Sequence, residues 1–139
     1  MKFYKSIVTV MLLLLTMVAV TVNAKDRNVK RMYVFGVSTS FNDSTVYFTT
    51  IQTLDSVNVA GKTSLLSDKQ EYSWQLKDYF SKHGMQNRTC VTVNNKDRKK
   101  LEKIYGKLKQ KYSKKWKYTV KSLADDDFKY ERVVEAQLQ

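Results

Sequence analysis

Two segments of this chain carry apolar side chains at the period of an α-helix, and strand-like segments lie before, between and after them. The first repeat places four residues at i, i+4, i+7 and i+8: Tyr72, Leu76, Tyr79 and Phe80. The second places five residues at i, i+3, i+4, i+7 and i+11: Leu101, Ile104, Tyr105, Leu108 and Tyr112. The strand-like segments are Met32–Val37, Val46–Leu54, Arg88–Val93, Trp116–Val120 and, more weakly, Phe128–Val134. This order predicts an α+β fold, β-β-α-β-α-β, in which one further strand is possible.

The first two strands are predicted to form a β-hairpin. Asn42-Asp43-Ser44 lies between them and supplies side chains that favour turns. Gly36 inside the first strand indicates a bulge or a close backbone approach. The following stretch, Asp55–Lys62, is interpreted as a loop or a short extra strand.

Both helices carry recognisable end signals. Ser67 or Asp68 is a suitable N-cap for the first helix, and His83-Gly84 ends it with a glycine where a left-handed residue is common. Asn94-Asn95 is expected to cap the second helix.

The predicted sheet is mixed, with two helices packed on one face. Each strand–helix–strand unit is expected to cross over in a right-handed sense, which would lay both helices on the same side. The other face would then stay open and could hold a partner.

Stability is expected to come from a packed core, because Cys90 is the only cysteine and no internal disulfide can form. The chain shows no internal repeat and no linker, so Lys25–Gln139 is predicted to be a single domain.

The first 24 residues have the three parts of a secretory signal peptide. Lys2 and Lys5 precede a 16-residue, largely apolar run, Ile7–Val22, and Val22-Asn23-Ala24 resembles a cleavage site. The run is shorter than the roughly 20 residues that span a bilayer comfortably. We therefore expect residues 1–24 to be a signal peptide and the protein to be exported to the periplasm or the extracellular space. An uncleaved anchor remains an alternative because basic residues follow the run closely. A lipid anchor is not expected, since no cysteine lies near the cleavage site.

Positive charge is concentrated in the segment Lys96–Lys121. It holds twelve Lys or Arg against Asp97 and Glu102, a net charge of +10, while the rest of the predicted domain is neutral. Concentrated charge of one sign attracts polyanions. Eight lysines are the candidate polyanion-binding residues: Lys99, Lys100, Lys103, Lys107, Lys109, Lys111, Lys114 and Lys115.

Two other interpretations of this segment stay open. The lysines could be the solvated side of an amphipathic helix whose aromatic residues lie in the core, or they could face a protein partner. If the protein is exported, the expected polyanions are acidic polysaccharides, phosphates of lipopolysaccharide or lipid headgroups, and nucleic acid is not expected.

No pattern in the chain predicts catalysis, a metal site or a cofactor. His83 is the only histidine, and Asp125-Asp126-Asp127 lacks the ligand spacing of a calcium loop. A thiol enzyme that uses Cys90 and His83 is one alternative, although nothing supplies a third orienting group. Cys90 is more simply explained as a small, buried residue.

Three segments resemble a family of small exported proteins of Gram-negative bacteria: Gly36–Asp55, Tyr72–Leu76 and Asn87–Cys90. The resemblance implies a location in the cell envelope and no particular activity. It also directs attention to two polar segments, Phe41–Thr45 and Asn87–Cys90.

These observations predict an exported, non-catalytic binding or accessory protein of the cell envelope that binds an anionic polymer through a lysine-rich helix. The main alternative is a structural subunit that pairs with another protein through its sheet or an edge strand.

Overall fold

The computed structural model describes residues 27–60 and 66–133, so the expected signal peptide, residues 1–24, lies outside the described residues. In chain order the elements are β1 (Arg27–Ser40), β2 (Thr45–Thr49), β3 (Gln52–Val59), α2 (Lys69–Lys82), β4 (Arg88–Asn95), α3 (Arg98–Gln110), a π-helical turn η1 (Lys111–Lys115) and β5 (Thr119–Leu123). The predicted α+β class with a mixed sheet is confirmed: in the described part of the chain, five strands form one sheet with two helices.

The long strand β1 is central to the sheet. β2 and β3 pair antiparallel with one of its edges, and β4 pairs antiparallel with the other. β5 pairs parallel with β2, from Thr45 opposite Thr119 to Thr49 opposite Leu123, which makes the sheet mixed.

β2 and β3 together form the second arm of the predicted hairpin, interrupted by a bulge. Val37 pairs with Phe48, whereas Val34 pairs with Gln52, so the two residues of β1 between these pairs lie opposite three residues of the partner. The extra residue bends the strand. At this point the Gly36 amide donates to Thr49 Oγ1 at 2.8 Å instead of joining the regular ladder.

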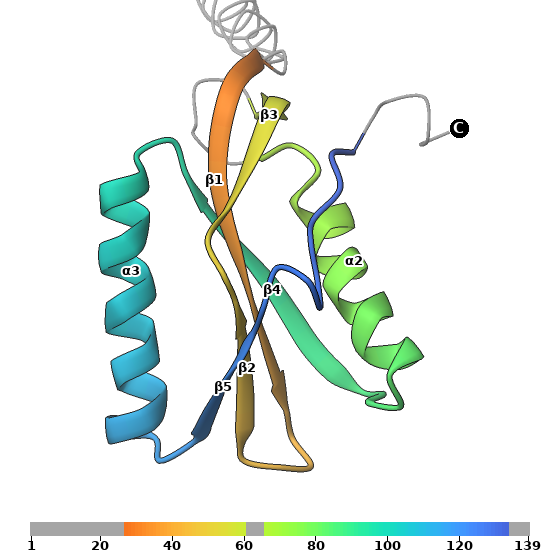
Figure 1. Cartoon of the computed structure of the whole chain (residues 1–139), viewed down its shortest axis with the longest axis vertical. Coiled ribbons are helices and arrows are strands. Elements are labelled where there is room, and N and C mark those ends of the chain that lie inside the picture. The colour runs from red at the N-terminus through yellow and green to blue at the C-terminus, as the bar shows by residue number, and fades with distance from the viewer. Residues whose placement is uncertain (1–26, 61–65, 134–139) are drawn as a thin grey trace, which may run out of the picture.

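The prediction that both helices share one face is wrong: α2 and α3 lie on opposite faces of the sheet (Figure 1). The chain crosses β1 from β3 to β4 through α2, and then returns over β1 and β2 to β5 through α3. Crossovers of the same hand that travel in opposite directions place their helices on opposite faces. The sheet face that was expected to stay open is therefore covered by a helix.

Each face of β1 contributes to its own hydrophobic cluster. Met32 and Val34 point to the α2 side, where they pack with Tyr72, Leu76 and Phe80 of that helix. On the α3 side a separate cluster contains Phe35, Val37, Val46, Phe48 and Leu101. The unbroken apolar run Met32–Val37 is the pattern of a strand that is buried on both faces.

The chain after β5 runs beside α2 on the same face of the sheet (Figure 1). The predicted final strand is not formed up to Val133, the last described residue. The Gln52 side chain instead binds this segment, donating to the Phe128 carbonyl at 3.1 Å and accepting from the Tyr130 amide at 2.7 Å. The Gln52 side chain thus makes hydrogen bonds to this segment that a neighbouring strand would otherwise make.

Two element ends differ from the sequence prediction. Asp97, and not Asn94 or Asn95, is the N-cap of α3, and its carboxylate accepts from the Lys99 amide at 2.9 Å. β5 begins at Thr119, so Trp116 lies before the strand in which it was placed. Gly84 does end α2 in the left-handed region, with φ of 77°, as predicted. In the described part of the chain, no helix is long and apolar enough to cross a bilayer.

Candidate functional site

The eight candidate lysines all lie on α3 and η1, and we call them the lysine face. Seven of them are exposed to solvent: Lys99, Lys100, Lys103, Lys107, Lys111, Lys114 and Lys115. Lys109 is half-buried, with its Nζ 4.3 Å from the centroid of the Tyr105 ring. Its charge is therefore used in a cation–π contact, and the structure sets it apart from the other seven.

The apolar stripe of α3 decides which side the lysines occupy. Leu101 is fully buried, and the Tyr105 ring packs edge-on against Phe35 and Phe48, with centroid distances of 4.8 and 5.6 Å. Glu102, the one acidic residue between Arg98 and Gln110, is paired with Arg98 at 3.1 Å. The charge of the outward lysines is thus not neutralised within the helix.

Four of these lysines surround an open groove of about 500 Å³. Its lining also contains Ile104, Leu108 and Gln110, and Ile104 is 40% exposed. The cationic lining residues are Lys107, Lys111, Lys114 and Lys115. A groove with an apolar floor and cationic walls can hold the backbone of a polyanion while lysine side chains contact its charges.

A second hollow lies at the end of α3, next to the turn between β1 and β2. It has a volume of about 390 Å³, and we call it the aromatic pocket; it is lined by Thr39, Ser40, Phe41, Tyr112, Trp116 and Tyr118. Phe41 is fully exposed and Trp116 is 47% exposed. Exposed aromatic side chains beside cationic ones are typical of binding surfaces.

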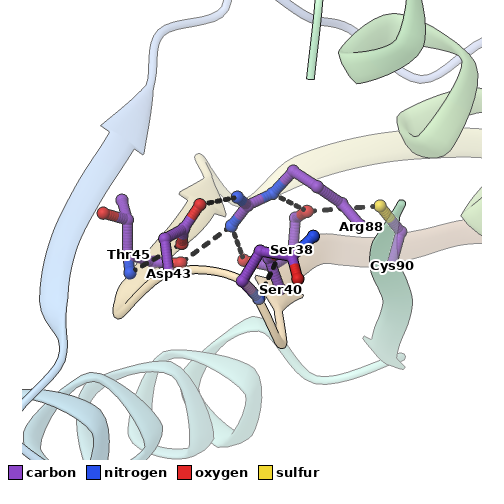
Figure 2. A network of polar contacts seen from close by, with 7 residues as sticks. Ser38, Ser40, Asp43, Thr45, Arg88 and Cys90 are labelled. Carbon is purple, nitrogen blue, oxygen red and sulfur yellow. Dashed lines mark hydrogen bonds and ion pairs between the residues drawn. The ribbon is translucent and has the colours of Figure 1, made fainter. Parts of the chain in front are cut away.

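Arg88 is the one buried arginine in the described chain, and its side chain is 3% exposed. Its guanidinium lies between the β1–β2 turn and the end of β1 (Figure 2). Nε donates to Ser38 Oγ at 2.9 Å, Nη2 donates to the carbonyls of Ser38 and Thr45 at 3.0 and 2.8 Å, and Nη1 contacts Asp43 Oδ2 at 3.3 Å. The guanidinium also lies 4.9 Å from the centroid of the Tyr47 ring.

This arginine network, made by Ser38, Asp43, Thr45, Arg88 and Cys90, joins the two polar segments that the sequence singled out. All three guanidinium nitrogens have a partner, so the buried charge is satisfied inside the fold. We assign it a structural role. It holds the turn that carries Phe41, and thereby one wall of the aromatic pocket.

The structure does not bring Cys90 and His83 together as a nucleophile and its base. Cys90 Sγ donates to Ser38 Oγ at 3.4 Å, while His83 Nδ1 contacts the Tyr79 carbonyl at 2.7 Å and its ring lies on the Tyr79 ring. Burial raises the pKa of the Cys90 thiol, and this outweighs the opposite effects of the Ser38 hydrogen bond and the Arg88 charge. A thiol with a raised pKa is a poor nucleophile at neutral pH.

Alkylation of Cys90 is expected to be at least about tenfold slower in the folded protein than in the denatured chain at pH 8. Because the pKa is raised in the fold, the rate for the folded protein should still increase at a pH where the rate for the denatured chain has levelled off. Maleimide labelling followed by mass spectrometry measures both rates. Fast labelling of the folded protein that levels off below pH 8 would contradict this and revive the thiol-enzyme alternative.

A third hollow, of about 600 Å³, lies between α2 and the segment that follows β5. Its lining includes Trp74, Asp78, His83 and Glu131. Asp78 is already paired with Lys82 at 2.7 Å, and Glu131 is joined to Gln75 through its backbone. Within residues 27–60 and 66–133, no three His, Cys, Asp or Glu residues are grouped as metal ligands.

The sequence did not reveal the aromatic pocket. The strand-like pattern of Trp116–Val120 does not distinguish Trp116, which is 47% exposed, from Tyr118, which is half-buried against the cluster on the α3 side, and Phe41 lies in a segment predicted to be polar. A usable signal was present at both places: Phe41 is flanked by Ser40 and Asn42, and Trp116 lies between two lysines. An aromatic residue in such polar surroundings is often exposed.

Comparisons of the chain with models of protein families, with curated proteins and with solved structures found no match.

Proposed function

We propose that this protein is an exported, non-catalytic binding protein and that its lysine face binds an anionic polymer. The observation that carries the proposal is the exposure of seven lysines on one side of α3 and η1, where the only acidic residue of α3 is already paired with Arg98. The lysines that line the groove around Ile104 are arranged on a concave surface. Such a surface suits a bound ligand and would not be needed if the lysines only contacted solvent.

Pairing with another protein through the sheet has weaker support. Both faces of the sheet carry a helix, so an interaction of that kind is restricted to the strand edges. The thiol-enzyme alternative requires a Cys90–His83 pair, and these two side chains have other partners.

Replacing Lys99, Lys103, Lys107 and Lys111 with glutamine should strongly weaken binding to an anionic polysaccharide and leave the fold intact, because all four side chains are exposed. The slope of log affinity against log salt concentration should fall by roughly one for each lysine that contacts the polymer. Retention of the purified protein on an anionic polysaccharide column, measured as the salt concentration at elution, tests this.

The matched control replaces Lys30, Lys77, Lys121 and Lys129 with glutamine. These four lysines are also exposed but lie outside α3 and η1, and their loss lowers the net charge by the same amount. Equal shifts in both variants would mean that only net charge matters and would refute a specific lysine face. Early elution of the wild-type protein at low salt would refute polyanion binding itself.

A further inference from the structure

The aromatic pocket adjoins the lysine face directly in the chain. Lys114 and Lys115 precede Trp116, and Lys117 lies between Trp116 and Tyr118. The β1–β2 turn and the end of α3 lie at the same end of the molecule (Figure 1), which places Phe41 beside Trp116 in the pocket lining. The groove around Ile104 and the aromatic pocket share no lining residue, so a polymer that contacts both has to pass around the end of the helix from the lysine face to these rings.

An irregular backbone presents these rings. After α3 the chain makes the π-helical turn η1, closed by a hydrogen bond of 2.9 Å from the Trp116 amide to the Lys111 carbonyl. Lys117 then adopts a positive φ of 58°, which costs a non-glycine residue about 1 kcal/mol or more. π-turns and left-handed residues are often found at functional sites.

The rings form a corner. The Tyr112 ring meets Trp116 at 78° with centroids 4.9 Å apart, and it meets Tyr118 at 89° with centroids 5.4 Å apart. The polar residues Thr39 and Ser40 belong to the same lining, and the Ser40 hydroxyl accepts a hydrogen bond from the Asn42 amide at 3.1 Å. The pocket thus combines apolar ring surfaces with a few polar groups, the usual composition of a small-molecule subsite.

We propose that the aromatic pocket is the subsite for one sugar ring of an acidic polysaccharide whose charged groups contact the lysine face. This proposal rests on the proposed function and names its ligand class. A sugar ring has an apolar CH face, which can pack on Trp116, and hydroxyl groups, which can form hydrogen bonds with the half-buried Thr39. A concave pocket of about 390 Å³ suits a single ring better than a bilayer surface.

Charge and ring contact can be separated by choice of ligand. Polygalacturonate oligosaccharides carry both charges and sugar rings, whereas inorganic polyphosphate carries charges alone. Trp116→Ala should weaken polygalacturonate binding by about five- to tenfold, as for truncation of an aromatic residue at a binding site. The same variant should leave polyphosphate binding unchanged. Trp74→Ala, which removes the other exposed tryptophan, on α2, should change neither.

Two further variants keep the test independent of folding. Phe41→Ala removes a side chain that lines the pocket, so it should lower the affinity for polygalacturonate. Because this side chain is fully exposed, the variant should be as stable as the wild type. Trp74→Phe leaves Trp116 as the only tryptophan, since the chain contains two. The fluorescence of Trp116 in this variant should change on saturation with polygalacturonate and stay constant with polyphosphate.

Binding is measured by titration calorimetry against both polymers, single-stranded DNA and vesicles of phosphatidylglycerol in phosphatidylcholine. Equal binding of polygalacturonate and polyphosphate, lost only in the Lys→Gln variant, would overturn the sugar subsite and retain the proposed function. Tighter binding of DNA or vesicles that depends on Trp116 would overturn it in favour of that ligand. No binding of any polyanion by the wild-type protein would refute the proposed function as well.

Discussion

Replacing Arg88 with methionine is expected to lower the free energy of unfolding by about 3 kcal/mol. Methionine can fill much of the space of the arginine stem, so the loss comes mainly from the polar partners. The carbonyls of Ser38 and Thr45 and the Ser38 hydroxyl would lose the bonds that Arg88 donates, and the Ser38 hydroxyl would keep only the weak donor Cys90 Sγ. Two of the three lost bonds are at buried Ser38. A buried polar group without a partner costs about 1–3 kcal/mol.

Asp43→Asn provides the control for the charge itself. The Asp43 side chain is 49% exposed, so solvent screens its ion pair with Arg88, and the variant should lose less than about 1 kcal/mol. Urea denaturation of both variants gives the comparison. If Arg88→Met is as stable as the wild type, the hydrogen bonds of the guanidinium do not stabilise the β1–β2 turn as the structure indicates.

Gly36→Ala is expected to destabilise the protein by about 3 kcal/mol, because there is no space for a side chain at this position. A Cβ atom here would overlap Tyr130 Oη and would lie 2.6 Å from Leu76 Cδ2. Both neighbours are held in place: Leu76 is fully buried in α2, and the Tyr130 backbone is bonded to Gln52. The backbone φ of Gly36 is not the reason, since Gly84 is the only described glycine with a positive φ.

Tyr130→Phe separates the overlap from other effects. Alone it removes a long contact of 3.4 Å to Thr92 Oγ1 and should cost less than about 1 kcal/mol. In the double variant the overlap with Oη is gone while that with Leu76 remains, so Gly36→Ala should become about 1 kcal/mol less harmful. Additive effects in thermal or urea unfolding would show that Tyr130 does not approach Gly36 closely.

The arginine network and the lysine face contribute to the candidate site in different ways. Arg88 is buried and satisfied, and it fixes the turn that carries Phe41. The lysines are exposed and, apart from Lys109, their charge is available to a ligand. Arg88→Met should therefore disturb the aromatic pocket through the turn, whereas the Lys→Gln variant should act on binding alone.

The amino-acid sequence by itself determined those features that depend on neighbours along the chain. The apolar periods of Tyr72–Phe80 and Leu101–Tyr112 predicted both helices, and the turn at Asn42–Ser44 predicted the hairpin. The apolar period of Leu101–Tyr112 also implies a polar face on the opposite side of that helix, and most of the lysine face lies there, exposed to solvent. These features follow from local periodicity, which the sequence carries directly.

The tertiary structure alone decided which face each helix covers, because that depends on the direction in which the second crossover travels across the sheet. It also brought Arg88 to Asp43 and Trp116 to Phe41, pairs far apart in the sequence that meet only when β4 and η1 reach the end of β1. No local pattern encodes these distances. The candidate binding site depends on both levels: the charge was visible in the chain, and the pocket beside it was formed by folding.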